Sequence, residues 1–238
     1  MRIAVVSDIH ANLTALDAVI ADLQTVGADL VVHGGDLVGG GPRPAEVIDR
    51  IRDLNWPGVF GNTDEMIWNP AVLDEKLPGD RFQALRHTLR SYTIPHALTA
   101  IGDDRLAWLR VMPLRWSDYD LTVIHAGPDS PWQFVPASVT DEQLTHVFGA
   151  LPTSRVVYGH IHVPFVRRLV GMTVVNAGAV SQSFDGDPRA SYAVLEGDSV
   201  EIRRVAYDVD KEIDLLLRSD DPLRESTAAT LRTGRYAP

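Results

Sequence analysis

Oxygen and nitrogen donor side chains recur at five places in the sequence, each time directly after a short apolar run. Donors of this kind, without a thiolate, suit Mn²⁺, Fe or Zn²⁺ at a catalytic centre better than a structural zinc site. Seven donors exceed the needs of one catalytic ion, which keeps a position open, so they favour two ions that share a bridge. The candidate metal ligands are Asp8, His10, Asp36, Asn62, His125, His160 and His162.

Short strands are the elements expected to position these donors. Compact runs rich in Val and Ile predict buried strands at residues 3–6, 30–32, 59–60, 121–124 and 156–158. Helical periodicity predicts one helix after Asn12, ending at Gly27, and a second that begins near Pro44. Because such alternation makes parallel βαβ units, whose ligands bind beyond the carboxyl ends of the strands, we expect the donors to meet at one sheet edge.

The rest of the chain predicts a helical insertion and a second sheet. Residues 65–117 contain helical stretches at 81–90 and 103–111, and we expect them to cover one edge, broken at Pro70, Pro78, Pro95 and Pro113. A capping box at Thr140 predicts another helix. Strands at 165–169, 173–175, 192–196 and 200–206 predict an antiparallel meander, and the polar residues 219–238 predict a tail that is loose at its end. The simplest interpretation is one domain, 1–238, with two β-sheets.

Composition excludes several classes of function. The 238 residues are 45% apolar and 23% charged, as in an ordinary globular protein. The 22 basic and 32 acidic residues give a net charge of −10, whereas binding of duplex nucleic acid or a nuclease channel needs a basic field. There is no cysteine, no apolar run of membrane-spanning length and no signal-peptide pattern, so we expect a cytoplasmic protein that does not bind membranes.

The donor motifs resemble those of the calcineurin-like metallophosphoesterases, above all the small bacterial phosphodiesterases and phosphatases. The resemblance covers residues 1 to about 208. It implies an α/β (α+β) fold, a four-layer α-β-β-α sandwich of two mixed sheets with a dinuclear metal site at the carboxyl ends of the strands. The family pattern D-x-H, G-D, G-N-H-[DE], a His after a strand and G-H-x-H is similar to Asp8-Ile9-His10, Gly35-Asp36, Gly61-Asn62-Thr63-Asp64, His125 and Gly159-His160-Ile161-His162.

The same resemblance implies how the donors are divided between two divalent ions. Mn²⁺ is the first expectation, and Fe and Zn²⁺ are alternatives. One ion is expected at Asp8, His10, Asp36 and His162. The other is expected at Asp36, Asn62, His125 and His160, with Asp36 as the bridge. Four positive charges against the two carboxylates give a local sum of +2, which would attract an anion despite the net charge of the chain.

The chemistry implied is hydrolysis of a small phosphorylated substrate by in-line attack of a metal-bridging hydroxide. Asp36, Asn62 and His125 are the expected catalytic residues, and the Asn62 amide can both bind a metal and donate to a phosphate oxygen. Phosphodiesters or activated phosphates are the favoured substrates, a nucleotide among them. A phosphomonoesterase, including a phosphoprotein phosphatase, is the first alternative. A non-catalytic protein-binding module is the second, although the complete donor set disfavours it. The oligomeric state is left open.

One position departs from the family pattern. Thr63 stands where the family often has a histidine that protonates the leaving group, and a threonine hydroxyl is too weak an acid for that step. Asp64 would then lack its usual partner. His33 and His96 are possible substitutes, but we interpret both as structural. Four tryptophans suggest either a base-stacking pocket or, more commonly, core packing: Trp68, Trp108, Trp116 and Trp132.

Overall fold

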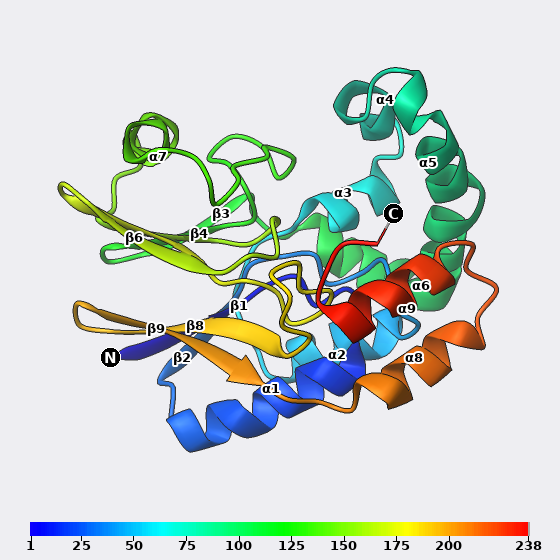
Figure 1. Ribbon diagram of the computed structural model, residues 1–238, viewed down its shortest axis with the longest axis horizontal. Coiled ribbons are helices and arrows are strands. Elements are labelled where there is room, and N and C mark those ends of the chain that lie inside the picture. Colours follow the sequence, from blue (N-terminus) through cyan, green and yellow to red (C-terminus); the bar gives the residue numbers. More distant parts are fainter. Residues whose placement is uncertain (238) are drawn as a thin grey trace.

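Two stacked β-sheets form the centre of the computed structural model, which describes residues 1–237 (Figure 1). The first sheet has the strand order β2-β1-β8-β9 and the second β3-β4-β5-β7-β6. Both are mixed, since each contains parallel and antiparallel pairs, which confirms the predicted fold class. The strands are β1 (Arg2–Val6), β2 (Leu30–His33), β3 (Arg115–Asp118), β4 (Leu121–Ile124), β5 (Arg155–Tyr158), β6 (Phe165–Leu169), β7 (Met172–Asn176), β8 (Ala190–Glu196) and β9 (Ser199–Val205).

Helices cover the outer face of each sheet (Figure 1). Most lie on the side of the first sheet, and α7 covers the second. Among residues 1–237, no helix is both long and apolar enough to cross a membrane. The helices are α1 (Leu13–Val26), α2 (Pro44–Asp53), α3 (Asn62–Trp68), α4 (Val72–Lys76), α5 (Gln83–Thr88), α6 (Ile94–Arg110), α7 (Asp141–Phe148), α8 (Val209–Leu217) and α9 (Arg224–Thr233), with a 3₁₀ turn at Asp80–Phe82 and a π turn at Leu89–Thr93.

Alternation of side chains along the central strands produces the four layers. In β1, Ile3 and Val5 pack between the two sheets, whereas Ala4 packs against the helices of the first sheet. In β5, Val157 packs between the sheets and Val156 packs toward α7. Both faces of these strands are therefore buried, which explains why they read as continuous apolar runs instead of alternating ones.

The predicted third strand is reduced to a single bridge. Gly58 pairs in parallel with His33, the His33 N–H donates to the Pro57 carbonyl at 2.9 Å, and the Val59 N–H donates to the His33 carbonyl at 3.1 Å. Pro57 has no N–H with which to extend the ladder, and the Phe60 N–H turns away to a loop carbonyl. The strand prediction at 59–60 was wrong, but the segment still lies beside β2.

The predicted meander is divided between the two sheets. β6 and β7 form a hairpin in the second sheet, while β8 and β9 form a hairpin in the first. Pairing of β8 with β1, for example Leu195 opposite Ile3, takes the second hairpin into the first sheet. The polar tail from Ser219 contains a helix that the sequence analysis did not predict, because α9 packs on α8 and buries Ala228 and Leu231.

Three of the four prolines expected to break the helical region lie between elements, namely Pro70, Pro78 and Pro113, but Pro95 does not interrupt it. Pro95 lies in the first turn of α6, directly after the π turn, so helical backbone continues across it. The wider π turn accommodates a ring that lacks an N–H and would crowd the preceding carbonyls of a regular helix. The interruption comes instead at Gly102, with φ +67°. Ile101 and Leu109 of α6 belong to the buried core above the first sheet.

Candidate metal centre

The backbone turns abruptly at the candidate donors. Five of the seven adopt the left-handed conformation, with φ between +49° and +66°, although none is glycine. This region is sparsely populated by residues with a side chain, and such strain clusters at functional sites. Because β1, β2 and β5 lead into such turns, the two donors of D-x-H and the two of G-H-x-H can face the same point instead of opposite faces of a strand. The five residues are Asp8, His10, Asp36, His160 and His162.

Two glycines allow the carboxylates to approach the main chain. A Cβ on Gly61 would lie 2.0 Å from Asp36 Oδ1, and one on Gly159 would lie 2.2 Å from Asp8 Oδ2. The space is used by hydrogen bonds: the Thr63 N–H donates to Asp36 Oδ1 at 2.8 Å. The His160 N–H donates to both Asp8 oxygens at 3.0 and 3.1 Å. The glycines that open two of the donor motifs therefore fix the orientation of both carboxylates.

Backbone carbonyls hold three of the histidines by the same ring nitrogen. Nδ1–H donates to Gly39 O at 3.0 Å in His10, to Gly34 O at 2.8 Å in His125 and to Gln182 O at 2.6 Å in His162. Each bond fixes the tautomer and leaves Nε2 with a lone pair. Anchoring of this kind is typical of metal-ligating histidines.

The freed Nε2 atoms converge. Those of His10 and His162 lie 3.2 Å apart, and His162 Nε2 is also 3.2 Å from Asp8 Oδ1. Two lone pairs that face each other and a carboxylate at this distance repel unless a cation lies between them. These three side chains form one buried set able to hold a metal ion, so the donors fit the ion that the sequence predicts there.

Asp36 belongs to a second set, which shares Asp8 with the first, and it also faces His10 of the first set. Its Oδ2 is 3.6 Å from His10 Nε2, and its Oδ1 is 3.5 Å from His125 Nε2. Asp8, Asp36 and His125 make up the second buried set of candidate ligands. The two oxygens of one carboxylate thus face different histidines, which is the arrangement that a bridging carboxylate requires.

Asn62 and His160 complete the group of seven less tightly. Asn62 is the first residue of α3, and its Oδ1 lies 2.9 Å from His125 Nε2. His160 falls outside both sets of candidate ligands, although its ring is edge-on to that of His125 with centroids 5.1 Å apart. It is more accessible than the other histidines of the centre.

The electrostatics of the centre follow from burial and from the close pairing of acid and imidazole. Burial alone would raise the pKa of Asp8, but the facing imidazoles, His162 first, hold it below its usual range. Burial alone would lower the pKa of His162, but Asp8 raises it. Burial lowers the pKa of His10, and burial together with His125 lowers that of His160 to about 4. At neutral pH the latter two rings are therefore uncharged and available as ligands.

Thr63 and Asp64 are both engaged with the main chain. The Thr63 hydroxyl donates to Val38 O at 2.7 Å. Asp64 does not lack a partner: its oxygens accept from the N–H groups of Leu37, Val38 and Gly61 at 2.9–3.1 Å. Burial and the charge of Asp36 raise the pKa of Asp64 to about 7. The local charge sum of +2 omitted this third carboxylate, and its ionisation would reduce the sum to +1.

Several supporting residues were not singled out from the sequence. Phe184 stacks on the His162 ring, with centroids 4.4 Å apart, and Tyr236 lies edge-on to Phe184 at 5.6 Å. Tyr236 thus brings the C-terminal segment toward the centre. Asn176, the last residue of β7, donates to Gly159 O at 2.6 Å. Carbonyl anchors such as Gly39 and Gln182 leave no side-chain signal that sequence reasoning could have used.

The remaining candidates have structural surroundings. His33 is buried against Trp108, and His96 is exposed and stacks on Tyr92. The tryptophans pack against the buried core, as the more common interpretation predicted. Trp132 also donates to Glu65 at 2.7 Å.

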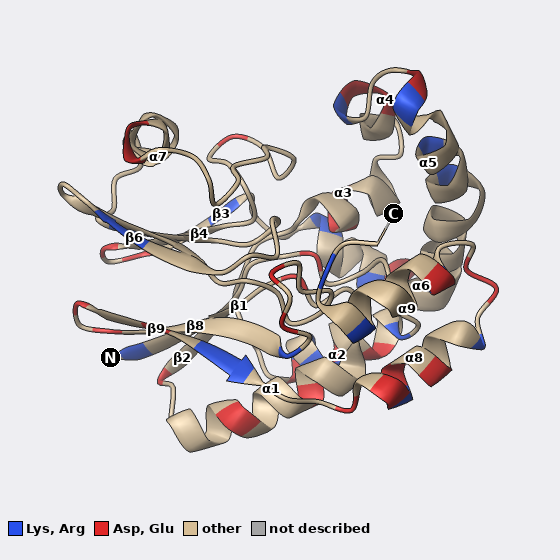
Figure 2. Cartoon of the chain, viewed as in Figure 1, with Lys and Arg blue, Asp and Glu red and all other residues tan. Residues whose placement is uncertain are grey.

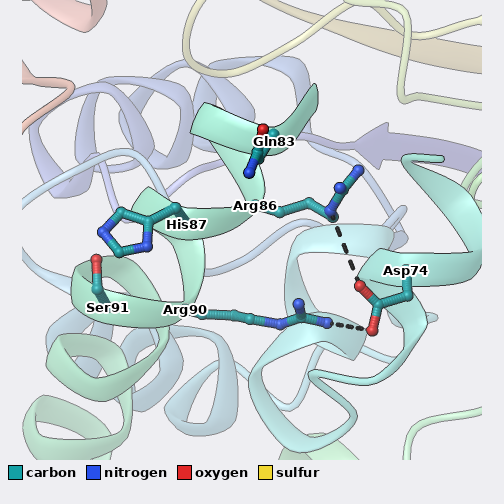
Figure 3. Close-up of a pocket in the computed structure, with 6 residues that line it drawn as sticks. All are labelled: Asp74, Gln83, Arg86, His87, Arg90 and Ser91. Carbon is teal, nitrogen blue, oxygen red and sulfur yellow. Dashed lines mark hydrogen bonds and ion pairs between the residues drawn. The ribbon is translucent and has the colours of Figure 1, made fainter. Parts of the chain in front are cut away.

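Basic side chains do not form a phosphate site of their own. In Figure 2, Lys and Arg are scattered among Asp and Glu over residues 1–237. A hollow between α4 and the π turn contains two arginines (Figure 3), but both point to Asp74. Arg90 donates to it at 2.7 Å, and Arg86 lies 3.8 Å from it while also donating to backbone carbonyls. The carboxylate therefore already balances much of the positive charge.

Comparison with known proteins identifies the family to which this centre belongs. The profile of the calcineurin-like phosphoesterase superfamily domain matches residues 1–199. The chain belongs to this superfamily. Its metallophosphoesterase fold carries two buried sets of Asp and His side chains that fit a dimetal site, so the predictions of family and of a hydrolase acting on phosphoric esters are confirmed.

Relatives match the chain along almost its whole length. An uncharacterized protein of Methanocaldococcus jannaschii is 30% identical over 243 residues, covering 92% of this chain and 93% of that protein. The crystal structure of a metallophosphoesterase from Sphaerobacter thermophilus is 31% identical with a TM-score of 0.79, covering 98% of this chain and 99% of that one. A hypothetical protein from Pyrococcus horikoshii shares the fold, with a TM-score of 0.82 at 20% identity and 98% coverage of both chains.

Proposed function

We propose that this metallophosphoesterase hydrolyses phosphodiesters or other activated phosphate esters, nucleotides among them, with two divalent ions. The observation that carries the proposal is the position of Asp36, whose two oxygens face His10 and His125 at 3.6 and 3.5 Å. We assign the first ion to Asp8, His10, Asp36 and His162, and the second to Asp36, Asn62, His125 and His160. Mn²⁺ is the first candidate metal, and Fe and Zn²⁺ are the alternatives.

The residues around these ions have different roles. When bound, the ions supply Lewis acidity that activates water and neutralises charge on the phosphate oxygens. Asp36 holds the two ligand sets at a fixed separation, and the carbonyl anchors keep the histidine lone pairs directed inward. Asn62 binds through its amide oxygen, and its NH₂ group is free to donate to a phosphate oxygen. Since few basic side chains compete, the ions supply most of the affinity for phosphate.

Thr63 supports the preference for activated substrates. Its hydroxyl already donates to Val38 O and is too weak an acid to protonate a leaving group. A leaving group that departs as a stable anion, such as a nitrophenolate or a phosphate, needs no such proton. We therefore expect the rate to fall steeply as the pKa of the leaving group rises across a series of aryl esters. A flat dependence, with the chemical step rate-limiting, would show that another group supplies the proton.

The decisive experiment combines metal removal with matched substrates. Exhaustive chelation should abolish hydrolysis, and Mn²⁺ should restore it to a greater extent than Fe or Zn²⁺. Bis(p-nitrophenyl) phosphate and p-nitrophenyl phosphate share one leaving group, so the ratio of their kcat/KM values reports the preference for a diester. Full turnover by protein shown to be metal-free would refute the proposal. A higher kcat/KM for the monoester would assign the protein to phosphomonoesterases, and no turnover of either by the metal-loaded protein would favour a binding role.

A further inference from the structure

Phe134 is an exposed apolar side chain placed beside the metal centre. It lies in the loop between β4 and α7 and is 69% exposed. Its ring is edge-on to that of His160, with centroids 6.4 Å apart. A phenylalanine ring that is mostly exposed contributes little hydrophobic free energy until a partner or ligand buries it. The ring lies next to the most accessible histidine of the centre, where a bound substrate can cover it.

The same ring lines a hollow of about 390 Å³ between its loop and α7. Two hydrogen bonds fix the loop and the helix that form its walls: the Tyr158 hydroxyl donates to Val135 O at 2.8 Å, and the Thr140 N–H donates to the Gln143 side chain at 2.8 Å. Apolar and polar side chains line the hollow in equal number, and sites for small organic molecules combine apolar surface with polar groups that fix orientation. The other apolar lining residues are Val135, Val139 and Val147, and the polar ones include Gln133, Glu142 and His146.

Size and charge restrict what this hollow accepts. Its volume is near the lower end of the roughly 300–1,000 Å³ range of small-molecule sites, so it suits a single ring system. Glu142 in the lining disfavours a second phosphate or another anionic group. Phe134 offers an aromatic face, on which planar rings stack regardless of their hydrogen-bonding pattern. A neutral, planar ring therefore matches the hollow better than an alkyl chain or a polyphosphate.

We propose that this hollow is a subsite for a planar aromatic substituent of the phosphate ester, either a nucleobase or an aryl ring, with Phe134 as its stacking surface. The proposal rests on the proposed function, because a phosphate bound by the metal ions beside His160 would present its substituent to Phe134. It assigns part of the substrate selectivity to the loop after β4 instead of the helices of residues 65–117.

The test uses two phosphonates that cannot be hydrolysed and differ only in the ring. Titration calorimetry of the Mn²⁺-loaded protein should show phenylphosphonate binding roughly tenfold more tightly than methylphosphonate. Phe134→Ala should reduce this ratio to near one, whereas Phe134→Tyr should retain it. Tyr119→Ala is the matched control, since Tyr119 is 88% exposed on the β3–β4 turn, and the ratio should not change. A ratio unaffected by Phe134→Ala would overturn the subsite, and equal affinities for the wild type would exclude an aryl ring from it.

A second pair of ligands distinguishes a nucleobase from an aryl ring. Adenosine 5′-monophosphate and ribose 5-phosphate, used as competitive inhibitors of bis(p-nitrophenyl) phosphate hydrolysis, differ by one base. A roughly tenfold lower inhibition constant for the nucleotide, lost in Phe134→Ala, would identify a nucleobase site. A ring effect confined to the phosphonates would identify an aryl site. If esters are hydrolysed but neither pair shows a ring effect, only the subsite fails. If no ester is hydrolysed and no phosphonate binds, the proposed function fails as well.

Discussion

His33 and the anchored histidines of the metal centre are alike in sequence position and burial but differ in their contacts. Each belongs to or follows a buried strand, and all are almost inaccessible. In His10, His125 and His162, Nδ1 donates to a carbonyl and Nε2 faces a carboxylate. In His33, Nδ1 has no partner, and no carboxylate within residues 1–237 pairs with the ring. Burial of a histidine at a strand end is therefore not sufficient for a metal ligand, because the ring must also be anchored and aimed.

Replacement of the bridging carboxylate should break this arrangement most severely. Asp36→Asn preserves size but removes the charge that holds two cations together. We expect the loss of at least one metal equivalent and a fall in kcat/KM on the order of 10³. Elemental analysis and steady-state kinetics measure both effects. An Asp36→Asn protein with two metal equivalents and near-normal turnover would contradict the bridging assignment.

Removal of one histidine from each side of Asp36, in two separate variants, should show which ion each histidine binds. His162→Ala should weaken the binding of the first ion, and His125→Ala should weaken the binding of the second. In each case the affinity should fall by at least about 100-fold, since loss of even an outer-shell partner costs roughly 10–100-fold. Metal titration followed by elemental analysis gives the stoichiometry. His33→Gln is the matched control and should retain both ions, so a loss of metal from this variant would erase the distinction between His33 and the anchored histidines.

The pH dependence of stability should distinguish His33, which pairs with no carboxylate of residues 1–237, from the histidines of the metal centre. Burial lowers the pKa of His33 to about 4, whereas an unfolded chain has a value near 6.5. Between these values the unfolded chain binds the extra proton, so the contribution of His33 is complete above pH 6.5 and is lost as the pH falls to 4. The loss is about 3 kcal/mol in the free energy of unfolding.

Urea titrations of the wild type and His33→Gln, performed at pH 7, 5.5 and 4.5, test this sign directly. The destabilisation between pH 7 and 4.5 should be smaller in the variant, because the carboxylates of the metal centre contribute equally to both proteins. Parallel pH profiles for the two proteins would show that His33 is protonated without cost in the folded state.

The smallest expected effect concerns Thr63, whose hydroxyl donates to a main-chain carbonyl of the loop after β2. Thr63→Val removes the hydrogen bond to Val38 O and should reduce the free energy of unfolding by about 1 kcal/mol. Its kcat for bis(p-nitrophenyl) phosphate should change by less than about threefold. Chemical denaturation and steady-state kinetics give the two numbers. A rate loss approaching 100-fold would make the hydroxyl a participant in catalysis.

Much of the central fold could be predicted because local pattern and tertiary environment agree there. Helix α1 begins after Asn12, whose side chain accepts from the Ala15 N–H, and ends at Gly27 with φ +65°. The capping box of Thr140 and Gln143 was also predicted correctly. The donor motifs lie together because they follow strands that are neighbours in the two sheets.

The missed elements are those in which distant contacts decide the outcome. Nothing local separates the hairpin that joins the first sheet from the one that joins the second, since pairing with β1 makes the difference. Helix α9 has a weak apolar stripe that includes Leu231, so its polar composition resembles a tail. The anchors of the histidines are main-chain carbonyls, which any residue could supply, and the division of donors between the ions remains a prediction from the family.

The left-handed turns at five of the donors carry an evolutionary consequence. Each such residue costs on the order of 1 kcal/mol, and glycine would remove most of that cost. Five of them together approach the net stability of an ordinary domain, about 5–15 kcal/mol. Selection for catalysis and selection for a robust fold therefore act in opposite directions at these positions. In a descendant that no longer needs the enzymatic activity, glycine should accumulate at positions 8, 10, 36, 160 and 162 before the strands change. This pattern would identify a protein that descends from an active enzyme.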